Sequence, residues 1–353
     1  MKAVILAGGH GTRFWPVSRQ SHPKQFLKIL GSRTMLQETV DRVRSLLSSQ
    51  DIYIVCSDQY VEEVRSQLPE LETKQIIVEP LVRSTASCIG LAATYLKRYY
   101  PDEVMAVLPS DHLIGQVDEF IQVLEAAQEL ANQNWLVTFG MQPSHPATGY
   151  GYLLQGEAIG KFGGYSAYQV AQFTEKPDLE QAAQFLLKGN YYWNSGMFVW
   201  KIKSILEEIN SCMPKLGQSL KEMDESWGNN ERMLELFASL ENISIDFGVM
   251  EKAKKVAFFP CDLGWNDMGS WKALEEISSQ NSQGMSSNIP YVNIDGRDCF
   301  VHAAQEKVIA LVGVENLLII DTPDALLVCD RERAEDVKKV VDRLKDKKLK
   351  EYL

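Results

Sequence analysis

The chain has 353 residues, of which 45% are hydrophobic, 24% charged and 9% aromatic, a composition typical of a soluble globular protein. Its formal net charge of −11 argues against nucleic acid as a partner, because no basic stripe exists outside the first segment. No apolar run approaches the ~18 residues of a membrane span, and the six cysteines show neither a CxxC pair nor metal-finger spacing. We therefore expect a cytoplasmic protein with no membrane partner and with reduced cysteines, made of one main domain and a smaller one.

The N-terminal stretch, residues 2–27, carries the strongest signal. The apolar run 4–6 ends at the glycine turn 7–9, a pattern typical of a buried strand followed by a tight loop. The first 37 residues contain six Lys or Arg and no Asp or Glu, although the chain as a whole is acidic. A locally basic, glycine-rich loop concentrates positive potential in one cleft, so we expect it to bind the phosphates of a small ligand.

The glycine turn matches neither of the two common phosphate-binding motifs. A Walker loop requires Lys-Ser or Lys-Thr after its glycines, and none follows here. A dinucleotide-binding turn requires a third glycine where Phe14 stands, and Asp58 lies too far along the chain to contact a ribose, which argues against a NAD-type dehydrogenase. Pro16 and Pro23 keep the following residues out of a helix, so we expect the basic side chains on an extended loop. The alternative interpretation is a plain strand and turn with solvated charges.

Residues 34–139 alternate between helical and strand patterns. Helical periodicity covers 34–48, 58–67, 84–98 and 120–131, and buried-strand runs cover 52–56, 75–79, 103–108 and 135–139. Such alternation indicates right-handed βαβ units on a mostly parallel sheet, in which ligands bind beyond the carboxyl ends of the strands. We therefore expect the turn at Gly8, Glu79 and Asp111 to share one rim of the sheet.

The pattern changes after residue 148. Longer strands are predicted at 149–152 and 168–173, a helix from 178, an aromatic strand at 191–200 interrupted at 194–196, mainly helical structure at 203–254, a strand at 256–259 and a last helix from 271. A polar linker at 281–288 precedes four evenly spaced apolar segments (299–303, 308–312, 317–320 and 325–328) and a charged terminal helix at 331–353. We therefore predict two domains, residues 1–282 and 283–353.

Two motifs near the start carry a resemblance to a known family. The run Gly8-Gly-His-Gly-Thr-Arg13, followed by Pro23-Lys24-Gln25-Phe26, resembles the signature of the sugar-1-phosphate nucleotidylyltransferases. The Pro-Lys-Gln-Phe ending is similar to the mannose-1-phosphate guanylyltransferase branch. The resemblance implies an α/β fold with a Rossmann-like, mostly parallel mixed sheet flanked by helices. It also implies a small C-terminal unit, similar to a β-helix and followed by a helix, that makes a homodimer contact.

The resemblance also implies an activity and a set of site residues. The activity is transfer of GMP from GTP to mannose 1-phosphate, giving GDP-mannose and pyrophosphate with Mg²⁺. Arg13, Lys24 and Lys176 are the implied catalytic cations. The implied nucleotide contacts are Leu6, Ala7, Gly8, Gly9, Gly11, Thr12, Arg13, Glu79, Arg83, Ser84, Thr85 and Ser110. The implied sugar-phosphate contacts are Lys24, Gly149, Tyr150, Glu175, Lys176 and Asn194.

The segment from Glu79 to Ser87 resembles the family's base-and-ribose motif but departs from its pattern. The usual Arg-Asn-Thr-Ala-Pro reads Arg83-Ser-Thr-Ala-Ser87 here, and a serine hydroxyl offers fewer donors than an asparagine amide. A guanine-binding site requires acceptors, which Glu79 or backbone carbonyls can supply. Simpler interpretations exist for two other residues: Asn194 fits a strand bulge beside Gly196, and Glu175 with its neighbouring lysine fits a solvated charge pair.

Two aspartates are predicted to hold the metal ion. Asp111 and Asp267 each follow an apolar strand, and Mg²⁺ takes one or two carboxylates and completes its shell with water and phosphates. Aspartates at matching positions of the family hold the catalytic Mg²⁺. The alternative interpretation is that each aspartate caps the helix that follows it. His112 is left out because Mg²⁺ prefers oxygen ligands.

The predicted chemistry requires little covalent machinery. A sugar 1-phosphate is already largely dianionic at neutral pH, so the main barrier is charge repulsion, which Mg²⁺ and the three cations would offset. The alternatives are a nucleotidylyltransferase for a heptose or glucose phosphate, or a non-catalytic nucleotide-sugar sensor. A sensor would be expected to lose a phosphate-binding cation or a metal aspartate, and this chain keeps Arg13, Lys24, Asp111, Lys176 and Asp267.

Overall fold

The computed structural model describes residues 1–9, 11–303 and 307–353, and it divides into two compact units. The first unit contains residues 1–8, 37–110 and 114–265, and the second contains 9–36, 111–113 and 266–353. This division differs from the linear boundary predicted at residue 282, because the basic glycine-rich segment packs with the C-terminal residues. Two short strands, β5 (Leu113–Ile114) and β11 (Trp265–Asn266), lie where the chain passes between the units.

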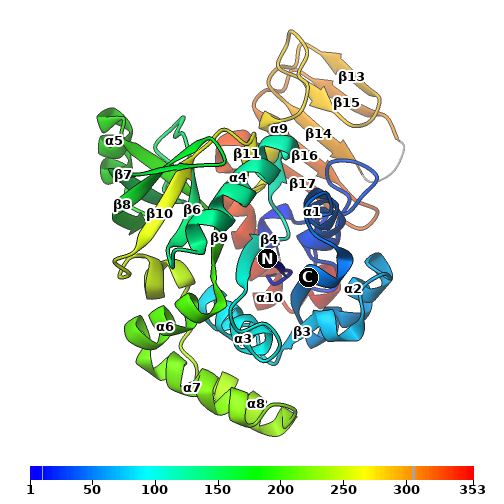
Figure 1. The fold of residues 1–353 in the computed structure, drawn as a ribbon. Helices are drawn as coiled ribbons and strands as arrows, with labels where there is room; N and C mark the ends of the chain where they lie inside the picture. The colour runs from blue at the N-terminus through cyan, green and yellow to red at the C-terminus, as the bar shows by residue number, and fades with distance from the viewer. Residues whose placement is uncertain (10, 304–306) are drawn as a thin grey trace. The chain divides into compact units, whose positions relative to one another are not determined.

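In the described part of the first unit, nine strands form one mixed sheet in the order β3-β2-β1-β4-β9-β6-β10-β8-β7 (Figure 1). Strands β1 to β4 pair in parallel, whereas β9 runs antiparallel to both β4 and β6. The Rossmann-like mixed sheet predicted from the sequence is therefore confirmed. The strands are β1 (Lys2–Leu6), β2 (Ile52–Ser57), β3 (Ile76–Glu79), β4 (Val104–Pro109), β6 (Leu136–Met141), β7 (Gly151–Phe162), β8 (Tyr165–Glu175), β9 (Tyr191–Lys201) and β10 (Val256–Pro260).

The parallel half of the sheet places predicted site residues along one edge. Leu6 lies beside Pro109 in the register of β1 and β4, and Glu79 ends β3 beside Ser57 of β2. The backbone N–H of Ser110 donates to the carbonyl of Leu6 at 3.1 Å, which extends this pairing by one residue. The carboxyl ends of β1, β3 and β4 therefore share an edge, as the alternation of helices and strands predicted.

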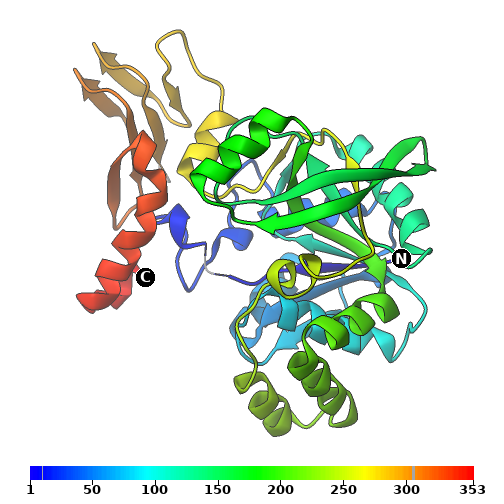
Figure 2. The same ribbon diagram turned by 90° about the vertical axis from the view of Figure 1, so that its left-hand side faces the viewer.

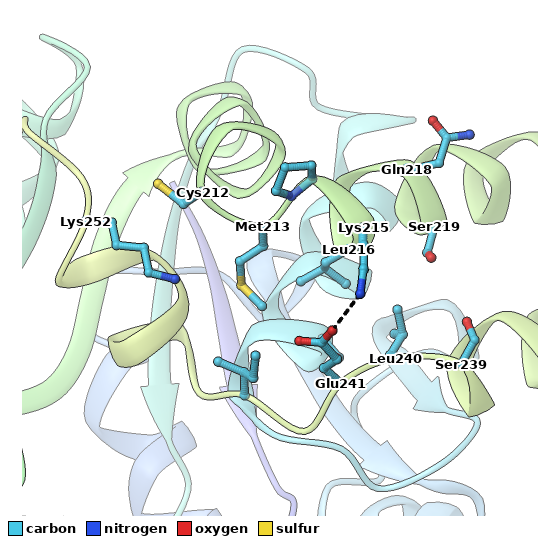
Figure 3. Close-up of a pocket in the computed structure, with 13 residues that line it drawn as sticks. Cys212, Met213, Lys215, Leu216, Gln218, Ser219, Ser239, Leu240, Glu241 and Lys252 are labelled. Carbon is cyan, nitrogen blue, oxygen red and sulfur yellow. Dashed lines mark hydrogen bonds and ion pairs between the residues drawn. The ribbon is translucent and has the colours of Figure 1, made fainter.

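Helices cover the sheet of the first unit, and the turn between α6 and α7 borders a cavity (Figure 3). Side-chain caps fix two helix starts: Asp178 accepts from the N–H of Gln181 at 2.8 Å, and Asn229 accepts from Arg232 at 3.1 Å. The helices are α1 (Met35–Val43), α2 (Val61–Gln67), α3 (Thr85–Lys97), α4 (Val117–Ala131), α5 (Leu179–Lys188), α6 (Ile202–Cys212), α7 (Pro214–Glu225) and α8 (Asn230–Ala238), followed by a π-helical turn, Asp246–Met250.

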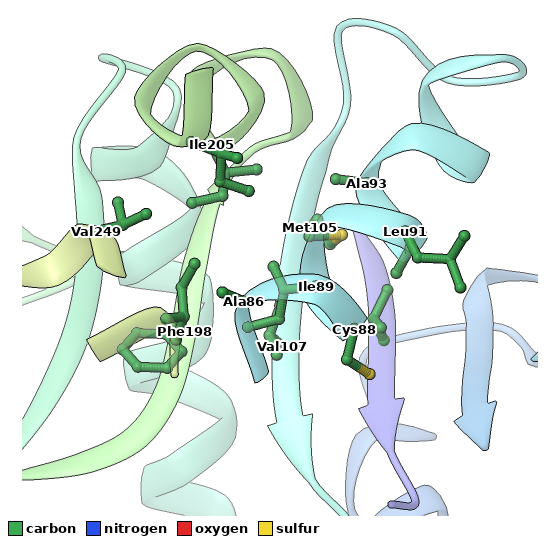
Figure 4. Close-up of a cluster of buried hydrophobic side chains, with 14 of the residues drawn as sticks. Ala86, Cys88, Ile89, Leu91, Ala93, Met105, Val107, Phe198, Ile205 and Val249 are labelled. Atoms are coloured by element: carbon green, nitrogen blue, oxygen red, sulfur yellow. The ribbon is translucent and has the colours of Figure 1, made fainter. Parts of the chain in front are cut away.

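The main core lies between the sheet and helices α3 and α6. Ile89 of α3, Val107 of β4, Phe198 of β9 and Ile205 of α6 are buried in this cluster (Figure 4). Small residues let α3 pack closely: a Cβ at Gly90 would lie 2.7 Å from Leu220 of α7. This packing holds the start of α3, which carries the predicted base-and-ribose motif, against the edge of the sheet.

Several predicted boundaries are wrong in detail. Strand β9 runs without the predicted interruption at 194–196, and the irregularity there is a register shift against β6. The two strands predicted at 149–152 and 168–173 are much longer and form one hairpin, β7 and β8. The helix predicted at 331–353 is broken into a 3-10 segment (Arg331–Asp336), α10 (Val337–Asp346) and a last 3-10 turn (Lys350–Tyr352).

The second unit contains a small β structure whose strands pair mainly in parallel. Tyr291 pairs with Ile309 and Phe300 pairs with Leu318, a constant offset of 18 residues that is typical of stacked β-helix turns. The strands are β12 (Ser286–Ser287), β13 (Tyr291–Ile294), β14 (Phe300–Ala303), β15 (Ile309–Val312), β16 (Leu317–Asp321) and β17 (Leu326–Asp330). The predicted C-terminal β unit is confirmed, although β12 falls within the predicted linker and β13 was not predicted.

Helix α10 closes the second unit over these strands (Figure 2). Its Val337 and Val341 share one buried cluster with Ile320 of β16 and Leu327 of β17. The same cluster contains Trp271, which begins the short helix α9 (Trp271–Glu276). Within the described residues, no helix is long and apolar enough to cross a membrane.

Candidate functional site

Five of the predicted residues line one small polar cavity in the second unit. The cavity has a volume of about 220 Å³. Three stretches that are far apart in the sequence meet there, namely the glycine-rich loop, the residues after β4 and the residues after β11. The lining residues are Gly11, Arg13, Phe14, Lys24, Asp111, His112, Asp267 and Gly269.

Gly11 is required by the shape of the loop. Its φ of +56° lies in the left-handed region, and a Cβ at this position would lie 2.5 Å from the Cβ of Lys24. Its carbonyl accepts hydrogen bonds from the N–H of Phe14 at 2.9 Å and from the hydroxyl of Ser18 at 2.5 Å. The glycine therefore brings the turn against Lys24, which stands 13 residues further along the chain.

Lys24 is a buried cation at the centre of this cavity. Its residue is only 3% exposed, and its Nζ lies 2.9 Å from Asp111 Oδ2. The same ammonium donates to the carbonyl of Asp267 at 3.0 Å and to that of Met268 at 2.6 Å. One lysine therefore holds together the two segments that carry the predicted metal ligands.

The two aspartates are fixed in different ways. Burial by itself raises the pKa of Asp111, but the charges of Lys24 and His112 and the hydrogen bond from Lys24 lower this pKa below its usual value. Asp267 Oδ1 accepts from the N–H of Gly269 at 3.0 Å. Met268, which lies between Asp267 and Gly269 in the chain, has a φ of +49°. Strained backbone conformations of this kind are common at functional sites. Both carboxylates border the same cavity, so the donor set fits a hard divalent cation.

Arg13 lies on the rim of the cavity with a partner that the sequence pattern did not identify. Its Nη1 lies 3.0 Å from Glu335 Oε2, and both side chains are exposed. An exposed ion pair of this kind contributes little to stability, so the guanidinium can exchange this partner for a phosphate at small cost. Thr12 shares the 3-10 turn with Arg13, and the carbonyl of Gly9 accepts from Gln25 at 3.3 Å.

The C-terminal residues anchor the basic loop. The indole N–H of Trp15 donates to the carbonyl of Tyr352 at 2.9 Å, and Arg19 donates to the same carbonyl. Arg19 also forms an ion pair with Asp324 at 3.0 Å. The indole of Trp271 donates to the carbonyl of Trp15 at 3.0 Å. The loop conformation therefore depends on residues that sequence analysis placed in a separate domain.

The remaining nucleotide-motif residues lie in the first unit, at the carboxyl ends of β1, β3 and β4. Ala7 continues β1 by donating to the carbonyl of Val55 at 2.8 Å, and a Cβ on Gly8 would meet no atom within 4 Å. The Ser110 hydroxyl is buried and has no hydrogen-bond partner among the residues that the structure describes. A buried hydroxyl without a partner is a candidate ligand contact.

Glu79 is buried at the end of β3. Burial raises its pKa to about 7, although the backbone N–H of Arg83, 3.2 Å from the carboxylate, acts to lower it. A carboxylate in such a site favours a ligand that donates hydrogen bonds to it. This supports the predicted role of Glu79 as an acceptor for a base, which remains a prediction.

Arg83 and Thr85 hold protein segments in place. The Arg83 guanidinium donates to the carbonyls of Phe237 at 3.2 Å and Ala238 at 2.9 Å, at the end of α8. The Thr85 hydroxyl accepts from the N–H of Ile245 at 2.9 Å. Ser84 is the N-cap residue of α3, without a side-chain cap bond. Arg83 and Thr85 therefore have a structural role. The nucleotide contacts predicted for Arg83, Ser84 and Thr85 stay predictions.

Glu175 is the last residue of strand β8 in the first unit, and Lys176 follows it. The Glu175 carboxylate is nearly buried and lies 3.1 Å from the exposed Lys176 ammonium. Burial and the negative charge of Asp246 raise the pKa of Glu175 to about 7, against the lowering effect of Lys176. Gly151 leaves room for this carboxylate, because a Cβ there would lie 2.5 Å from Glu175 Oε2. A Cβ at the predicted Gly149 would meet no atom within 4 Å.

Asn194 is buried in a polar network that sequence analysis missed. Its Nδ2 donates to Asp246 Oδ1 at 3.0 Å, and the Thr138 hydroxyl lies 2.8 Å from its Oδ1. Burial raises the pKa of Asp246. The N–H of Glu175 donates to Glu251 Oε1 at 2.8 Å, so the π-helical turn and the residue after it support both sugar-motif residues. Asp246 follows no strand and begins no predicted motif, so no local sequence pattern indicates its role.

Tyr150 belongs to an aromatic group in the first unit. Its ring lies 5.1 Å from Trp193 and 5.2 Å from Trp265, both in edge-on contacts. The Tyr150 carbonyl accepts from the N–H of Lys176 at 3.2 Å, and Lys176 has a φ of +48°. These contacts bring the predicted residues Tyr150, Glu175 and Lys176 together within one unit.

Comparisons with known proteins show which family the chain belongs to. A model of the nucleotidyl transferase family matches residues 2–284, and a model of the mannose-phosphate isomerase/GMP-like β-helix domain matches 290–344. Mannose-1-phosphate guanylyltransferases of Escherichia coli and Klebsiella pneumoniae are each 39% identical over 356 residues, covering 99% of this chain and 75% of the relative.

A solved structure extends the similarity to the whole fold. The crystal structure of a Thermus thermophilus enzyme named mannose-1-phosphate geranyltransferase matches with a TM-score of 0.87 at 30% identity. The match covers 98% of this chain and 99% of that one. The chain therefore belongs to the nucleotidyl transferase family and, within it, to the mannose-1-phosphate guanylyltransferases.

Proposed function

We propose that this protein transfers GMP from GTP to mannose 1-phosphate, giving GDP-mannose and pyrophosphate. The observation that carries the proposal is the meeting of Arg13, Lys24, Asp111 and Asp267 at one cavity, in a chain that belongs to this enzyme family. Two carboxylates and two basic side chains suit a ligand made of phosphates and a divalent metal ion. Ser84 stands where the family pattern has an asparagine, and this difference affects how the base is bound. Ser84 does not line this cavity.

We infer that the metal ion is Mg²⁺ and that Asp111 and Asp267 hold it. Nucleotidyl transferases generally use a divalent metal. Mg²⁺ is commonly bound by one or two carboxylates and by substrate phosphates, which matches the donor set of the cavity. When bound, the ion would neutralise charge on the phosphates of the nucleotide.

The chain's own residues have separate roles in the proposed reaction. An oxygen of mannose 1-phosphate forms a bond to the α-phosphorus of GTP, and the bond from that phosphorus to the bridging oxygen of the β-phosphate breaks. The electron pair leaves with pyrophosphate, so no protein group has to accept a proton. Arg13 and Lys24 stabilise the charge of the triphosphate, and Lys176 binds the phosphate of the sugar.

We propose that the sugar hydroxyls are bound by Glu175 and Asn194 and that Asp246 orients the asparagine amide. Because Asp246 accepts from Asn194 Nδ2, the amide oxygen is turned toward Thr138 and its orientation is fixed. Closely related sugars differ in one hydroxyl, so this network is where a heptose or glucose phosphate would be distinguished from mannose 1-phosphate. Glu79 is proposed to accept the donors of guanine.

We propose that the protein forms a homodimer through its C-terminal β unit. Val292 and Ile294 of β13 lie beside Ala310 and Val312 of β15 in the parallel register, and all four are exposed on one face. Leu326 and Val328 of β17 are exposed as well. Apolar side chains gathered on one surface are typical of a contact with another protein chain. Light scattering of Ile294→Lys should show a monomer if this face forms the contact.

The proposed reaction is tested by following the α-phosphate of GTP. Protein incubated with α-labelled GTP, mannose 1-phosphate and Mg²⁺ should move the label into GDP-mannose and release unlabelled pyrophosphate. Chelation of the metal with EDTA should stop the transfer, and added Mg²⁺ should restore it. Tight binding of labelled GTP without any transfer would favour the non-catalytic sensor instead.

A further inference from the structure

A second and larger cavity lies in the first unit, and among the described residues none of its lining is a predicted site residue. Its volume is about 910 Å³, which falls in the range of roughly 300–1,000 Å³ found for small-molecule pockets. The turn between α6 and α7 forms one side, and the segment 239–243 after α8 forms another (Figure 3). The cavity therefore has the size and walls of a ligand site separate from the catalytic residues.

The lining of this cavity is mainly apolar. Met213, Leu216, Leu240 and Ile243 all contribute to it, and both leucines belong to the buried core of the first unit. An apolar group that enters such a site gains free energy from the surface it removes from water. The body of a suitable ligand is therefore apolar.

The charges around the cavity favour an anion. Lys215 and Glu241 form an ion pair of 3.2 Å that joins α7 to the segment after α8, and both side chains are largely exposed. Lys252 extends from another side toward Met213 (Figure 3). Two lysines and one glutamate give the lining a positive balance, although the whole chain carries −11. A negatively charged group on a ligand would pair with Lys252.

We propose that this cavity is a second, non-catalytic binding site for a small anion with an apolar body. We further propose that its occupancy changes the affinity of the catalytic site. The second claim depends on the proposed function of the nucleotide and sugar motifs, whereas the first does not.

The wall of the cavity is bonded directly to the base-and-ribose motif. Immediately before the wall segment, the carbonyls of Phe237 and Ala238 accept from Arg83. At its other end, the carbonyl of Ile243 accepts from the N–H of Ala86 at 3.4 Å. The N–H of Ile245 then donates to Thr85. A ligand that shifts or stiffens residues 239–243 therefore acts on both ends of the nucleotide motif.

The same segment continues into the sugar motif. Asp246 accepts from Asn194, and Glu251 accepts from the N–H of Glu175. Lys252, the next residue, lines the cavity. One continuous stretch, residues 237–252, therefore contacts the cavity and both substrate motifs. If ligands at the cavity and at the substrate motifs both change the conformation of this stretch, each ligand must change the binding affinity of the other by the same factor.

The site is tested with anilinonaphthalene sulfonate, an aromatic dye with one negative charge that fluoresces strongly in apolar surroundings. The protein should bind one dye molecule with saturable, blue-shifted fluorescence. Lys252→Gln should weaken this binding roughly two- to fivefold, the usual effect of one surface charge. Lys254→Gln removes an exposed lysine two residues away that does not line the cavity, so it should leave binding unchanged. The uncharged dye phenylnaphthylamine should bind both variants equally.

A filling variant separates this cavity from other apolar surfaces. Ser219 lines the cavity from α7, and Ser219→Trp should abolish dye binding while a thermal melt confirms that the protein is folded. Undiminished binding to a folded Ser219→Trp protein would overturn the proposed site. If that variant does not fold, an equal effect of the two lysine substitutions would overturn it.

The coupling is tested by titrating the dye in the presence of increasing GTP without sugar phosphate. The apparent dye affinity should change by a finite factor that levels off at saturating GTP. If the apparent dye affinity keeps falling as the GTP concentration rises, the dye occupies the nucleotide site itself. An apparent dye affinity that does not change with GTP would overturn the coupling. Because dye binding requires no turnover, failure of the proposed reaction would be detected separately.

Discussion

The ammonium of Lys24 lies 2.9 Å from Asp111 Oδ2, which joins a predicted phosphate-binding residue to a predicted metal ligand. The same group donates to the carbonyls of Asp267 and Met268, and it is almost completely buried. Lys24 therefore holds two aspartate-bearing segments around one cavity, and we propose that it also neutralises the substrate phosphates. In the proposed reaction, loss of this ammonium removes a positive charge from the site. It also removes the contacts that position the two aspartate-bearing segments.

Lys24→Gln should lower kcat by about 10²–10³-fold, the cost of removing one preorganised charge-stabilising group. The measurement is the rate of pyrophosphate release at saturating GTP and mannose 1-phosphate. Lys28→Gln is the matched control, since Lys28 lies on the same segment and is exposed. Comparable losses in both variants would show that net charge of the loop matters and that the position of Lys24 does not.

Asp267→Asn should raise the Mg²⁺ concentration for half-maximal rate by about 10–100-fold, because an amide replaces a charged ligand. The Asn side chain can still accept from the N–H of Gly269, so the loop should keep its shape. Asp262→Asn, on the preceding exposed loop, should leave the Mg²⁺ dependence unchanged. A wild-type rate that is insensitive to EDTA would contradict the proposed metal site.

Asp246→Asn should raise the KM for mannose 1-phosphate and leave the KM for GTP unchanged, because Asp246 orients Asn194. It should also alter the pH profile. Burial and the charge of Asp246 raise the pKa of Glu175 to about 7, so kcat/KM for the sugar phosphate should fall as pH drops through about 7. Without the charge of Asp246 the pKa of Glu175 falls, and this acid limb should move to lower pH.

The control for that prediction is Thr138→Val, which removes a hydroxyl beside Asn194 without changing any charge. It should raise the KM for mannose 1-phosphate but leave the midpoint of the acid limb in place. An identical pH midpoint in wild type and Asp246→Asn would show that the two carboxylates do not interact.

Glu79→Gln should stabilise the protein at pH 8 and weaken GTP binding. The folded pKa of Glu79 is about 7, above its unfolded value near 4.5, so its ionisation costs stability as pH rises through that window. The full cost, about 3 kcal/mol, is present above pH 7 and absent below about pH 4.5. Melting temperatures at pH 8 and pH 5 should therefore differ more in wild type than in the variant.

The same variant tests the proposed role of Glu79 in base binding. A glutamine has one acceptor oxygen where the carboxylate has two, so the KM for GTP should rise about tenfold or more. Stabilisation without any change in KM would leave Glu79 as a buried group with no contact to the base.

The fold could be predicted because it depends on local patterns: alternating strand and helix periodicity predicted the sheet. The roles of Glu79, Asp111 and Glu175 came from motifs at strand ends together with the family resemblance, and these roles stay predictions. Partners that pack from distant segments could not be predicted. Gly11 lies against Lys24 only because of the loop fold, and Glu335 approaches Arg13 from the far end of the chain. The sequence pattern does not report such contacts.

Other contacts could not be predicted for the same reason. The close approach to Glu175 across the hairpin is made by Gly151, which was not among the predicted site residues, and the sugar contact predicted for Gly149 stays a prediction. Asp246 was not predicted because it lies in a π-helical turn inside a polar helical region, where an acidic residue is usually solvated. Strand β13 sits beside a polar linker, and only its pairing with β15 identifies it.

The proposed transfer of GMP to mannose 1-phosphate is best tested by pyrophosphate release from every pairing of GTP, ATP, UTP and dTTP with mannose, glucose and heptose 1-phosphates. We expect turnover with GTP and mannose 1-phosphate in the presence of Mg²⁺, and a far lower rate for every other pair. Efficient turnover with another pair would contradict the proposed specificity at Glu79, Glu175 or Asn194. No turnover with any pair, alongside GTP binding, would contradict the proposed reaction itself.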